Sequence, residues 1–207
     1  MASMIGIELP AFAIATALVT PSAISHWSAL NHHHLTDQIP RTVTAMTTRR
    51  TVLPTMRHGG RTGARHTWTV GSTTVEYVTV NPTRFFGIEE IWLDERFKTP
   101  ITDRERTVLE LFVSPRHFGG LGEALSVLEE HMASLDVPKL VRYGVAIDVG
   151  AVAKRLGYSL ERAGIDAATL EPLRAVPAEG VRVLDPTRPK KGHRVASWSL
   201  VDNLTPA

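Results

Sequence analysis

ITDRERTVLELFVSPRHFGGLGEALSVLEEHM, residues 101–132, is the stretch that carries the clearest fold signal in this chain. Thr102 and Glu105 form the pattern T-x-x-E, which is typical of a helix start whose two side chains each bond a free backbone N–H. Apolar residues then recur at helical spacing until Pro115 and Gly119-Gly120 interrupt them. They are Val108, Leu111 and Phe112 before the break and Leu121, Ala124, Leu125, Leu128 and Met132 after it. The stretch therefore predicts two helices joined by a glycine-containing turn.

The composition is that of an ordinary folded chain, with 43% hydrophobic and 21% charged residues among 207. No cysteine is present, which excludes disulfides, thiolate metal sites and a cysteine nucleophile. The apolar run from Ala11 to Val19 has the character of a signal-peptide core, but Glu8 precedes it and no lysine or arginine does. The run is also too short to span a membrane. We expect a buried helix there.

Periodicity along the rest of the chain predicts alternating blocks of helices and strands. The expected helices are Leu9–Val19, Ala23–His33 with Ser22 as its cap, Val137–Val145, Val149–Ala163 closed by Gly164, and Asp166–Leu173. The expected strands are Thr42–Thr47, His66–Val70, Thr73–Val80, Arg84–Leu93 with a bulge at Gly87, Val181–Leu184 and Val195–Leu200. Together they indicate an α+β fold with short N-terminal helices, a small and mostly antiparallel sheet, a helical bundle over 102–175 and two late strands. We expect one domain over 1–207, with sub-parts 1–100 and 101–207.

Charge is unevenly distributed along the chain. Between Gln38 and Val75 there are six arginines and no acidic residue, whereas the remainder carries 17 basic against 21 acidic residues. Arginine pairs bidentately with phosphate oxygens, and such pairs supply much of the affinity in nucleic-acid binding. The predicted nucleic-acid contacts are Arg41, Arg49, Arg50, Arg57, Arg61 and Arg65, with Lys190 and Lys191 from a late loop. The alternative is a basic loop that only keeps the chain soluble.

Patterns that would indicate catalysis or metal binding are weak. Adjacent histidines on a helix point about 100° apart, so His32, His33 and His34 cannot converge on one ion, although His26 shares a face with His33. The carboxylates at Glu89-Glu90, Asp94-Glu95 and Asp103 alternate along a strand and its turn, as on a solvated face. No G-x-S-x-G elbow or G-x-G-x-x-G loop is present. We expect no catalytic residue, no bound metal and no cofactor.

Several short pieces, in order, resemble the AbiEi-type antitoxins. The first part is Ile24–Leu30 (ISHWSAL), His33 and Leu35–Pro40 (LTDQIP). The second is Phe86-Gly87, Ile101–Asp103, Glu105–Thr107, Gly119–Leu121 and Glu123–Leu125, and the third is Leu184–Pro186 with Gly192, Trp198 and Asn203. The resemblance covers about residues 10–204. It implies a cytoplasmic bacterial antitoxin and transcriptional regulator of a type IV toxin–antitoxin system, whose partner is a nucleotidyltransferase-like toxin.

Three departures from that family pattern bear on function. Members use an N-terminal winged helix to bind their own promoter, and we expect no counterpart of it here, because the resemblance starts almost at Met1. His34 stands where the pattern has glycine, at a helix end that favours a left-handed conformation. Arg104 replaces a proline in the first turn of the helix that begins near Thr102.

The sequence therefore predicts a non-enzymatic antitoxin and regulator that binds DNA, a nucleotidyltransferase-like toxin or both, with no membrane association. A second hypothesis is a protein-interaction module without DNA affinity, in which the helices after Thr102 form the interaction face. An enzyme acting on nucleic acid is a third hypothesis, for which no convergent catalytic set is visible.

Overall fold

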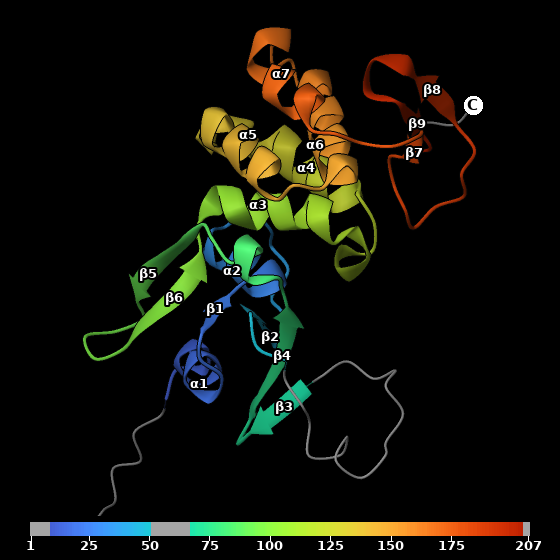
Figure 1. Ribbon diagram of the computed structural model, residues 1–207. Helices are drawn as coiled ribbons and strands as arrows, with labels where there is room; N and C mark the ends of the chain where they lie inside the picture. The colour runs from blue at the N-terminus through green and yellow to red at the C-terminus, as the bar shows by residue number, and fades with distance from the viewer. Residues whose placement is uncertain (1–8, 51–66, 205–207) are drawn as a thin grey trace, which may run out of the picture. The chain divides into compact units, whose positions relative to one another are not determined.

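The computed structural model describes residues 9–50 and 67–204, which divide into two compact units (Figure 1). The first unit takes the described residues of Met1–Ala29 and Ile39–Thr102, and the second takes Leu30–Gln38 and those of Asp103–Ala207. The fold is α+β, as the sequence predicted. Within the described ranges, every helix falls short of the length and apolarity that crossing a bilayer requires.

A six-stranded mixed sheet forms most of the first unit, in the order β3-β4-β2-β1-β6-β5. Its strands are β1 (Ser22–Ile24), β2 (Val43–Thr47), β3 (Thr67–Val70), β4 (Thr73–Thr79), β5 (Ile88–Trp92) and β6 (Lys98–Thr102). Three neighbouring pairs are antiparallel, as expected, but β1–β6 and β2–β4 run parallel. The predicted two-residue turn Gly71-Ser72 joins β3 to β4, and Gly71 has the positive φ of 58° that such turns use.

Residues Ser22–Ile24 form a strand, so the prediction of a helix beginning at Ala23 is wrong at its start. α2 spans only His26–His32. All three β1 residues are buried, because β1 lies between β2 and β6 in the sheet. A three-residue strand is too short to show an alternating pattern, and its partners lie about twenty and eighty positions away in sequence. The secondary structure of Ser22–Ile24 is therefore set by pairing with strands distant in sequence.

Helix α1 (Ala11–Leu18) belongs to the hydrophobic core of the first unit. The core gathers Ala15 with Ile24, Ala29, Ala45, Val75, Tyr77 and Ile101. The Tyr77 hydroxyl donates to the Ala15 carbonyl at 2.5 Å, and burial raises the pKa of Tyr77 to about 12. This bond satisfies the one polar group of an otherwise apolar contact and fixes α1 against β4.

Five helices form the larger part of the second unit (Figure 1). They are α3 (Arg104–Val113), α4 (Gly122–His131), α5 (Val137–Ala146), α6 (Gly150–Arg162) and α7 (Ala167–Ala175). The helical hairpin predicted over residues 101–132 is present as α3 and α4, joined by the 3-10 turn η3 (Pro115–Phe118) and the positive-φ residues Gly119 and Gly120. His34 has a φ of 55°, so this histidine takes the left-handed conformation that a glycine would adopt more easily after the end of α2.

The start of α3 differs from the predicted capping box. Asp103 is the N-cap, and its carboxylate accepts the Arg106 N–H at 2.8 Å. The Thr102 hydroxyl donates instead to the Ile24 carbonyl at 3.3 Å. Glu105 turns away from the cap and accepts the Asp136 N–H at 3.0 Å. The predicted box is wrong because both of its side chains are used in long-range contacts, and an aspartate caps as well as a threonine.

A compact ionic cluster joins α3 to α5. The Lys139 ammonium lies 3.1 Å from Asp103 Oδ2 and 2.8 Å from Glu105 Oε2, and the Tyr143 hydroxyl donates to Asp103 at 2.8 Å. Burial alone would raise the pKa of Glu105, but the bonds from Lys139 and the Asp136 N–H outweigh it and lower that pKa. Burial and the bond to Asp103 raise the pKa of Tyr143 to about 12. The cluster holds α5 on α3 through charge-assisted bonds.

We predict that Glu105→Gln destabilises the protein in a pH-dependent way. Because the folded pKa of Glu105 is lowered, its carboxylate contributes stability above its unfolded pKa and loses that contribution as pH falls through the folded value. The loss of unfolding free energy should be about 1–2 kcal/mol at neutral pH and shrink toward zero near pH 3. Urea unfolding at several pH values measures it. Glu129→Gln, at an exposed position of α4, is the control. A difference independent of pH would contradict the assignment.

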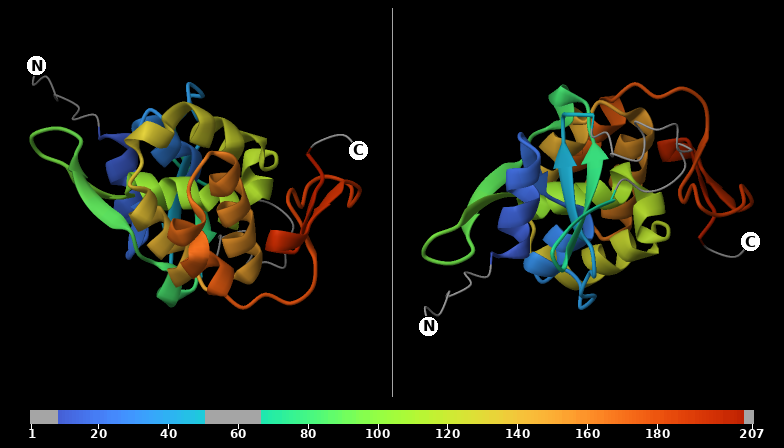
Figure 2. Two further views of the ribbon diagram at one scale, coloured as in Figure 1. Left: turned by 90° about the horizontal axis from the view of Figure 1, so that it is seen from above. Right: turned by 90° about the horizontal axis from the view of Figure 1, so that it is seen from below.

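Three short strands complete the second unit. They are β7 (Arg182–Val183), β8 (His193–Val195) and β9 (Leu200–Asp202), in the order β7-β9-β8. Of the two predicted late strands, Val181–Leu184 contains β7. The prediction of a strand over Val195–Leu200 is wrong, because Ala196–Trp198 form a 3-10 helix (η5) and only the two ends of that range belong to β8 and β9. Both views of Figure 2 show this sheet beside the helices of the same unit. It is attached at the turn before α4, where a Cβ placed on Gly120 would lie 2.7 Å from Asp185 Oδ2.

We predict that Gly120→Ala destabilises the protein, whereas Gly122→Ala does not. Gly120 has a φ of 132° and no room for a side chain beside Asp185 and Thr187. Gly122 is the first residue of α4 and faces open space. The first change should lower the unfolding free energy by about 2 kcal/mol or more, and the second should be neutral or slightly stabilising. Thermal and urea unfolding measure both. Equal effects would show that the close approach at Gly120 is unimportant.

Candidate nucleic-acid interface

Three of the six predicted arginines lie within the described residues. Arg41 precedes β2, and Arg49 and Arg50 follow it, all three with exposed side chains. Arg57, Arg61 and Arg65 lie outside the described residues. The backbone at the end of β2 is held firmly, since the Arg49 N–H donates to Thr47 Oγ1 at 3.1 Å and the Arg49 carbonyl accepts from the Thr79 hydroxyl at 3.4 Å. Arg49 and Arg50 are thus presented from an anchored strand end.

The structure does not bring Arg41 together with Arg49 and Arg50. The five residues of β2 separate them, and at about 3.3 Å per residue these alone span about 13 Å. That distance is too long for one phosphate group, and it is several times the rise of about 3.4 Å per phosphate along one strand of duplex DNA. The described arginines therefore form two positive points at opposite ends of one strand.

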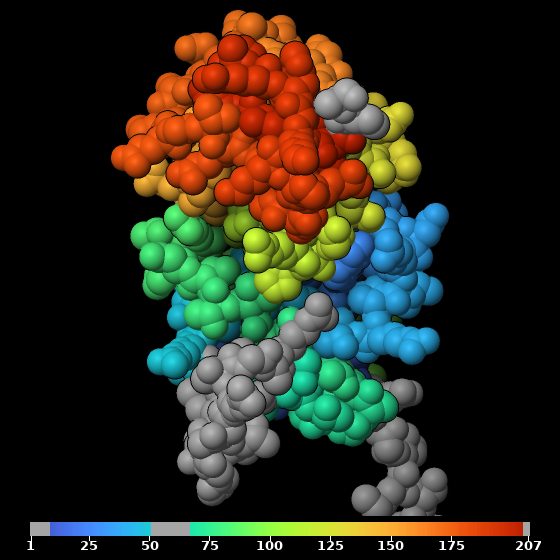
Figure 3. All heavy atoms as spheres, turned by 90° about the vertical axis from the view of Figure 1, so that its right-hand side faces the viewer, coloured from blue at the N-terminus to red at the C-terminus, as the bar shows by residue number. Residues whose placement is uncertain are grey.

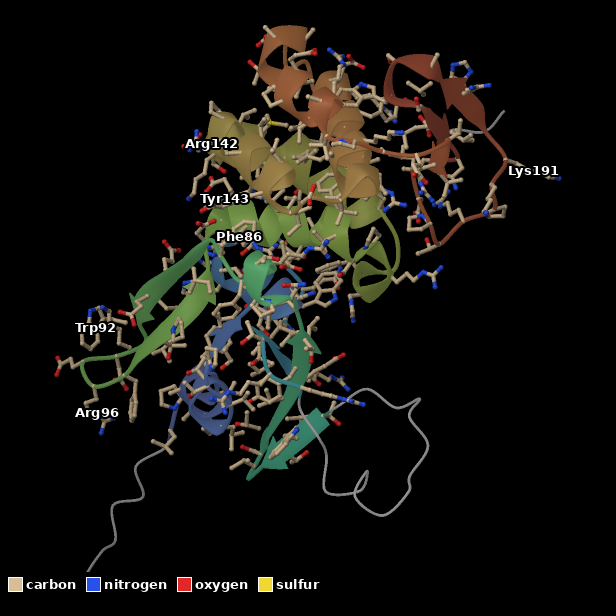
Figure 4. All side chains as sticks on the ribbon, in the orientation of Figure 1. Phe86, Trp92, Arg96, Arg142, Tyr143 and Lys191 are labelled. Atoms are coloured by element: carbon tan, nitrogen blue, oxygen red, sulfur yellow. The ribbon has the colours of Figure 1, made fainter. Side chains whose placement is uncertain are left out.

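Lys190 and Lys191 lie in the loop between β7 and β8, and both are exposed. The structure adds two cations that the sequence reasoning did not select, Arg188 and Arg194, which are also exposed. We call these four residues the C-terminal basic surface. Residues 188–194 read RPKKGHR, with four cations and no acidic residue. The local charge count of this run, taken over seven residues, is the signal that would have found the two arginines. In Figure 4, Lys191 projects from this loop away from the strands.

A buried carboxylate holds the loop that carries this surface. Asp185 is 1% exposed, and it accepts the N–H of Leu121 at 3.0 Å and the N–H of Thr187 at 2.7 Å. Asn203 brackets the same loop, because its side-chain N–H₂ donates to the carbonyls of Asp185 at 2.9 Å and Pro189 at 3.0 Å. Rigid support of this kind reduces the ordering cost when a surface loop binds.

Electrostatics favour an anion at this loop. Burial alone would raise the pKa of Asp185, but the hydrogen bonds from Thr187 and Leu121 lower it, with a further contribution from Arg188. The Asp185 carboxylate therefore stays ionised at neutral pH. It lies inside the loop, and Arg188 pairs with it at 3.9 Å. Lys190, Lys191 and Arg194 have no ion-pair partner among residues 9–50 and 67–204. Their charge is available to a ligand. In the space-filling view of Figure 3 the C-terminal segment, in red, forms a continuous outer surface of its unit.

A second group of cations lies beside β7. Burial and the charge of Arg182 both lower the pKa of Lys154, whose ammonium donates to the Gly180 carbonyl at 3.1 Å. In the register of the sheet, Arg182 is level with the buried Leu200, whereas Arg194 is level with Val201. Arg182 and Arg194 thus belong to opposite faces of the small sheet. Arg182 and Lys154 are for this reason not part of the C-terminal basic surface.

Three of the residues considered for metal binding or catalysis, His32, His33 and Asp103, make structural contacts. Among the described residues, no group of three histidine, cysteine or acidic side chains is placed to hold a metal ion. The rings of His32 and His33 contact each other edge to face at 5.2 Å, and the His33 carbonyl accepts from Arg104 at 3.2 Å. Asp103 is the cap of α3. These contacts are structural.

The class of protein is defined by this arrangement: an α+β chain with a mixed six-stranded sheet, a set of helices and a small C-terminal sheet. Its fold is similar to that in the crystal structure of the RV2827C protein from Mycobacterium tuberculosis, with a TM-score of 0.58 and 16% sequence identity. The match covers 91% of this chain and 65% of that chain. No family model and no curated protein matches the sequence. At this identity the likeness concerns the fold alone.

We predict that Lys190-Lys191 and Arg49-Arg50 contribute separately to the salt dependence of duplex DNA binding. Lys190→Ala/Lys191→Ala should reduce the slope of log K against log salt by about 2, because each phosphate contact contributes about 0.9. Arg49→Ala/Arg50→Ala tests the other region with the same loss of charge. Arg96→Ala/Arg142→Ala, both exposed and outside the two regions (Figure 4), is the control and should leave the slope nearly unchanged. Equal slopes for all three variants would refute both predicted regions.

Proposed function

We propose that this chain is a non-enzymatic antitoxin and transcriptional regulator of the AbiEi type. It binds nucleic acid through lysine and arginine side chains and counteracts a nucleotidyltransferase-like toxin in a bacterial cytoplasm. The nucleic-acid contacts are Arg41, Arg49, Arg50, Arg57, Arg61, Arg65, Lys190 and Lys191, extended by Arg188 and Arg194.

The observation that carries nucleic-acid binding is the C-terminal basic surface. Four exposed cations within seven residues, on a loop held by Asp185 and Asn203, match the repeated negative charge of a phosphate backbone. Arginine at both ends of the run allows bidentate pairing with phosphate, while Lys190 and Lys191 contribute mobile point charges. Such a surface supplies affinity and positioning, but it carries no base readout by itself.

The antitoxin assignment rests on the resemblance, and the structure offers a physical account of the residues that carry it. A side chain at Gly157 would overlap the Trp198 ring, and one at Gly192 would overlap the Asp202 backbone. Asn203 accepts the Asp185 N–H at 2.8 Å through its side-chain oxygen. Gly192 and Asn203 thus make close contacts around the small sheet, and Trp198 packs against α6. A chain that has all of these residues in order meets the packing requirements of this sheet.

A protein-interaction module without DNA affinity is the second candidate function. It is favoured by the open edge of the first unit's sheet, where Trp92 is 65% exposed. Large exposed aromatic side chains are enriched at protein interfaces. This candidate moves the expected interaction face from the helices after Thr102 to β5.

We predict that the chain binds duplex DNA from upstream of its own gene with a salt slope of about −3 or steeper. We also predict that it restores the growth of cells expressing the nucleotidyltransferase-like protein encoded beside it. Fluorescence anisotropy from low to physiological salt measures the first, and co-expression growth assays measure the second. No DNA binding at low salt would remove the regulator role. Rescue without DNA binding would favour the interaction module, and failure of both would reject the proposal.

A further inference from the structure

Strand β5 has an open backbone edge. It is the last strand of the six-stranded sheet, and among residues 9–50 and 67–204 it pairs only with β6. The Leu93 N–H donates to the Phe97 carbonyl at 2.8 Å. Because hydrogen-bonded and non-hydrogen-bonded pairs alternate in an antiparallel ladder, Ile91 and Glu89 also point their backbone groups toward β6. The N–H and C=O groups of Ile88, Glu90 and Trp92 therefore point toward the open side.

Trp92, at the end of this edge, is unusually exposed for an aromatic side chain. The Trp92 indole is 65% exposed, and the Lys98 ammonium lies 5.8 Å from its ring centroid. Lys98 also pairs with Glu90 at 2.5 Å. Figure 4 shows Trp92 near the far end of the β5–β6 hairpin, with Arg96 beyond it. An exposed indole held in place by a cation is a preorganised anchor for a partner.

An apolar groove adjoins the same hairpin. It has a volume of about 580 Å³ and lies between α1 and the hairpin. The hairpin contributes Ile88, Phe97 and Pro100, and α1 contributes Ala13 and Ile14. Two-residue alternation places Ile88 on the same face of β5 as Glu90 and Trp92. A strand added at the open edge would thus have a place for alternate apolar side chains.

The net negative charge along the β5 edge favours a positively charged partner. Residues 89–98 contain four acidic side chains, Glu89, Glu90, Asp94 and Glu95, against two basic ones. Both cations are already compensated, since Lys98 pairs with Glu90 and Arg96 with Asp94 at 3.6 Å. Glu89 and Glu95 are exposed and have no ion-pair partner within the described part of the chain. The charges on this edge that remain available to a partner, those of Glu89 and Glu95, are therefore negative.

We infer that the β5 edge is a docking site for an extended strand of a positively charged partner protein. The partner's backbone would bond the outward groups of Ile88, Glu90 and Trp92, and its lysines or arginines would pair with Glu89 and Glu95. A second copy is disfavoured, because antiparallel pairing of β5 about its centre would set Glu90 against Glu90. Nucleic acid is disfavoured by the same negative charge. The inference does not depend on the proposed DNA binding.

The test uses the full chain and a synthetic peptide that alternates lysine with valine over seven residues. Amide shifts in ¹⁵N–¹H NMR spectra should move most at Ile88, Glu90 and Trp92 as the peptide is added. A peptide with glutamate in place of lysine should leave them unchanged. Movement centred on other residues, or equal binding of the glutamate peptide, would overturn the inference.

Three variants separate the contributions of charge, anchor and backbone. Glu89→Lys/Glu95→Lys should weaken peptide binding roughly tenfold, and Glu129→Lys/Glu130→Lys, a matched charge change on α4, should not. Trp92→Ala should weaken it roughly tenfold or more. Glu90→Pro removes one outward N–H without removing a β5–β6 bond, so it should abolish binding while the fold persists.

The other occupants give distinct results. Loss of duplex DNA binding in Trp92→Ala would show that the edge contacts nucleic acid. A dimer in sedimentation that Trp92→Ala dissociates would show that the edge receives a second copy. Either result would overturn the inferred partner class. If the edge variants bind DNA normally and lose only the peptide, the inference stands whether or not the regulator role does.

Discussion

The hydrogen bonds to the Asp185 carboxylate join two distant parts of the second unit. Burying a charged carboxylate costs free energy, but Asp185 remains charged because the N–H groups of Leu121 and Thr187 donate to it. Leu121 stands at the entry to α4, so one side chain joins a helix start to the C-terminal strands. Asn203 closes the arrangement from the other end of the segment. The hydrogen bond from the Leu121 N–H to this carboxylate holds the turn at Gly120 against the loop that carries the basic surface.

The residues that carry the family resemblance are different from those proposed to contact partners. Gly120, Gly192, Trp198 and Asn203 act at short distances inside one unit, where a change of a single atom group causes overlap or an unmet hydrogen bond. Lysine and arginine side chains on the surface are solvated by water, and their exact positions contribute little to the stability of the fold. Close packing therefore accounts for the order and spacing of the recognised motifs, and the contact residues must be found from charge and exposure.

Opposite charges are gathered on separate features of the fold. The C-terminal basic surface belongs to the second unit, and the acidic β5 edge belongs to the first. Each has an anchored backbone beneath it: the Asp185 and Asn203 bonds in one case and the β5–β6 ladder in the other. We propose both as binding surfaces, one for phosphate groups and the other for a basic polypeptide.

The sequence by itself determined α1, the helices α3 to α7 and the β3–β4 hairpin, because helical periodicity and turn glycines are local properties. It also placed Arg41 before a predicted strand and Arg49 and Arg50 after it, and it selected Lys190 and Lys191 from a loop. Only the tertiary structure decided that Ser22–Ile24 is a strand, and that Asp103 caps α3 while Thr102 and Glu105 bond residues distant in sequence. The β5 edge also became visible only when the strand order was known. In each of these cases the deciding partner lies far away in the sequence, and no local pattern records a hydrogen bond or a strand neighbour that folding brings together.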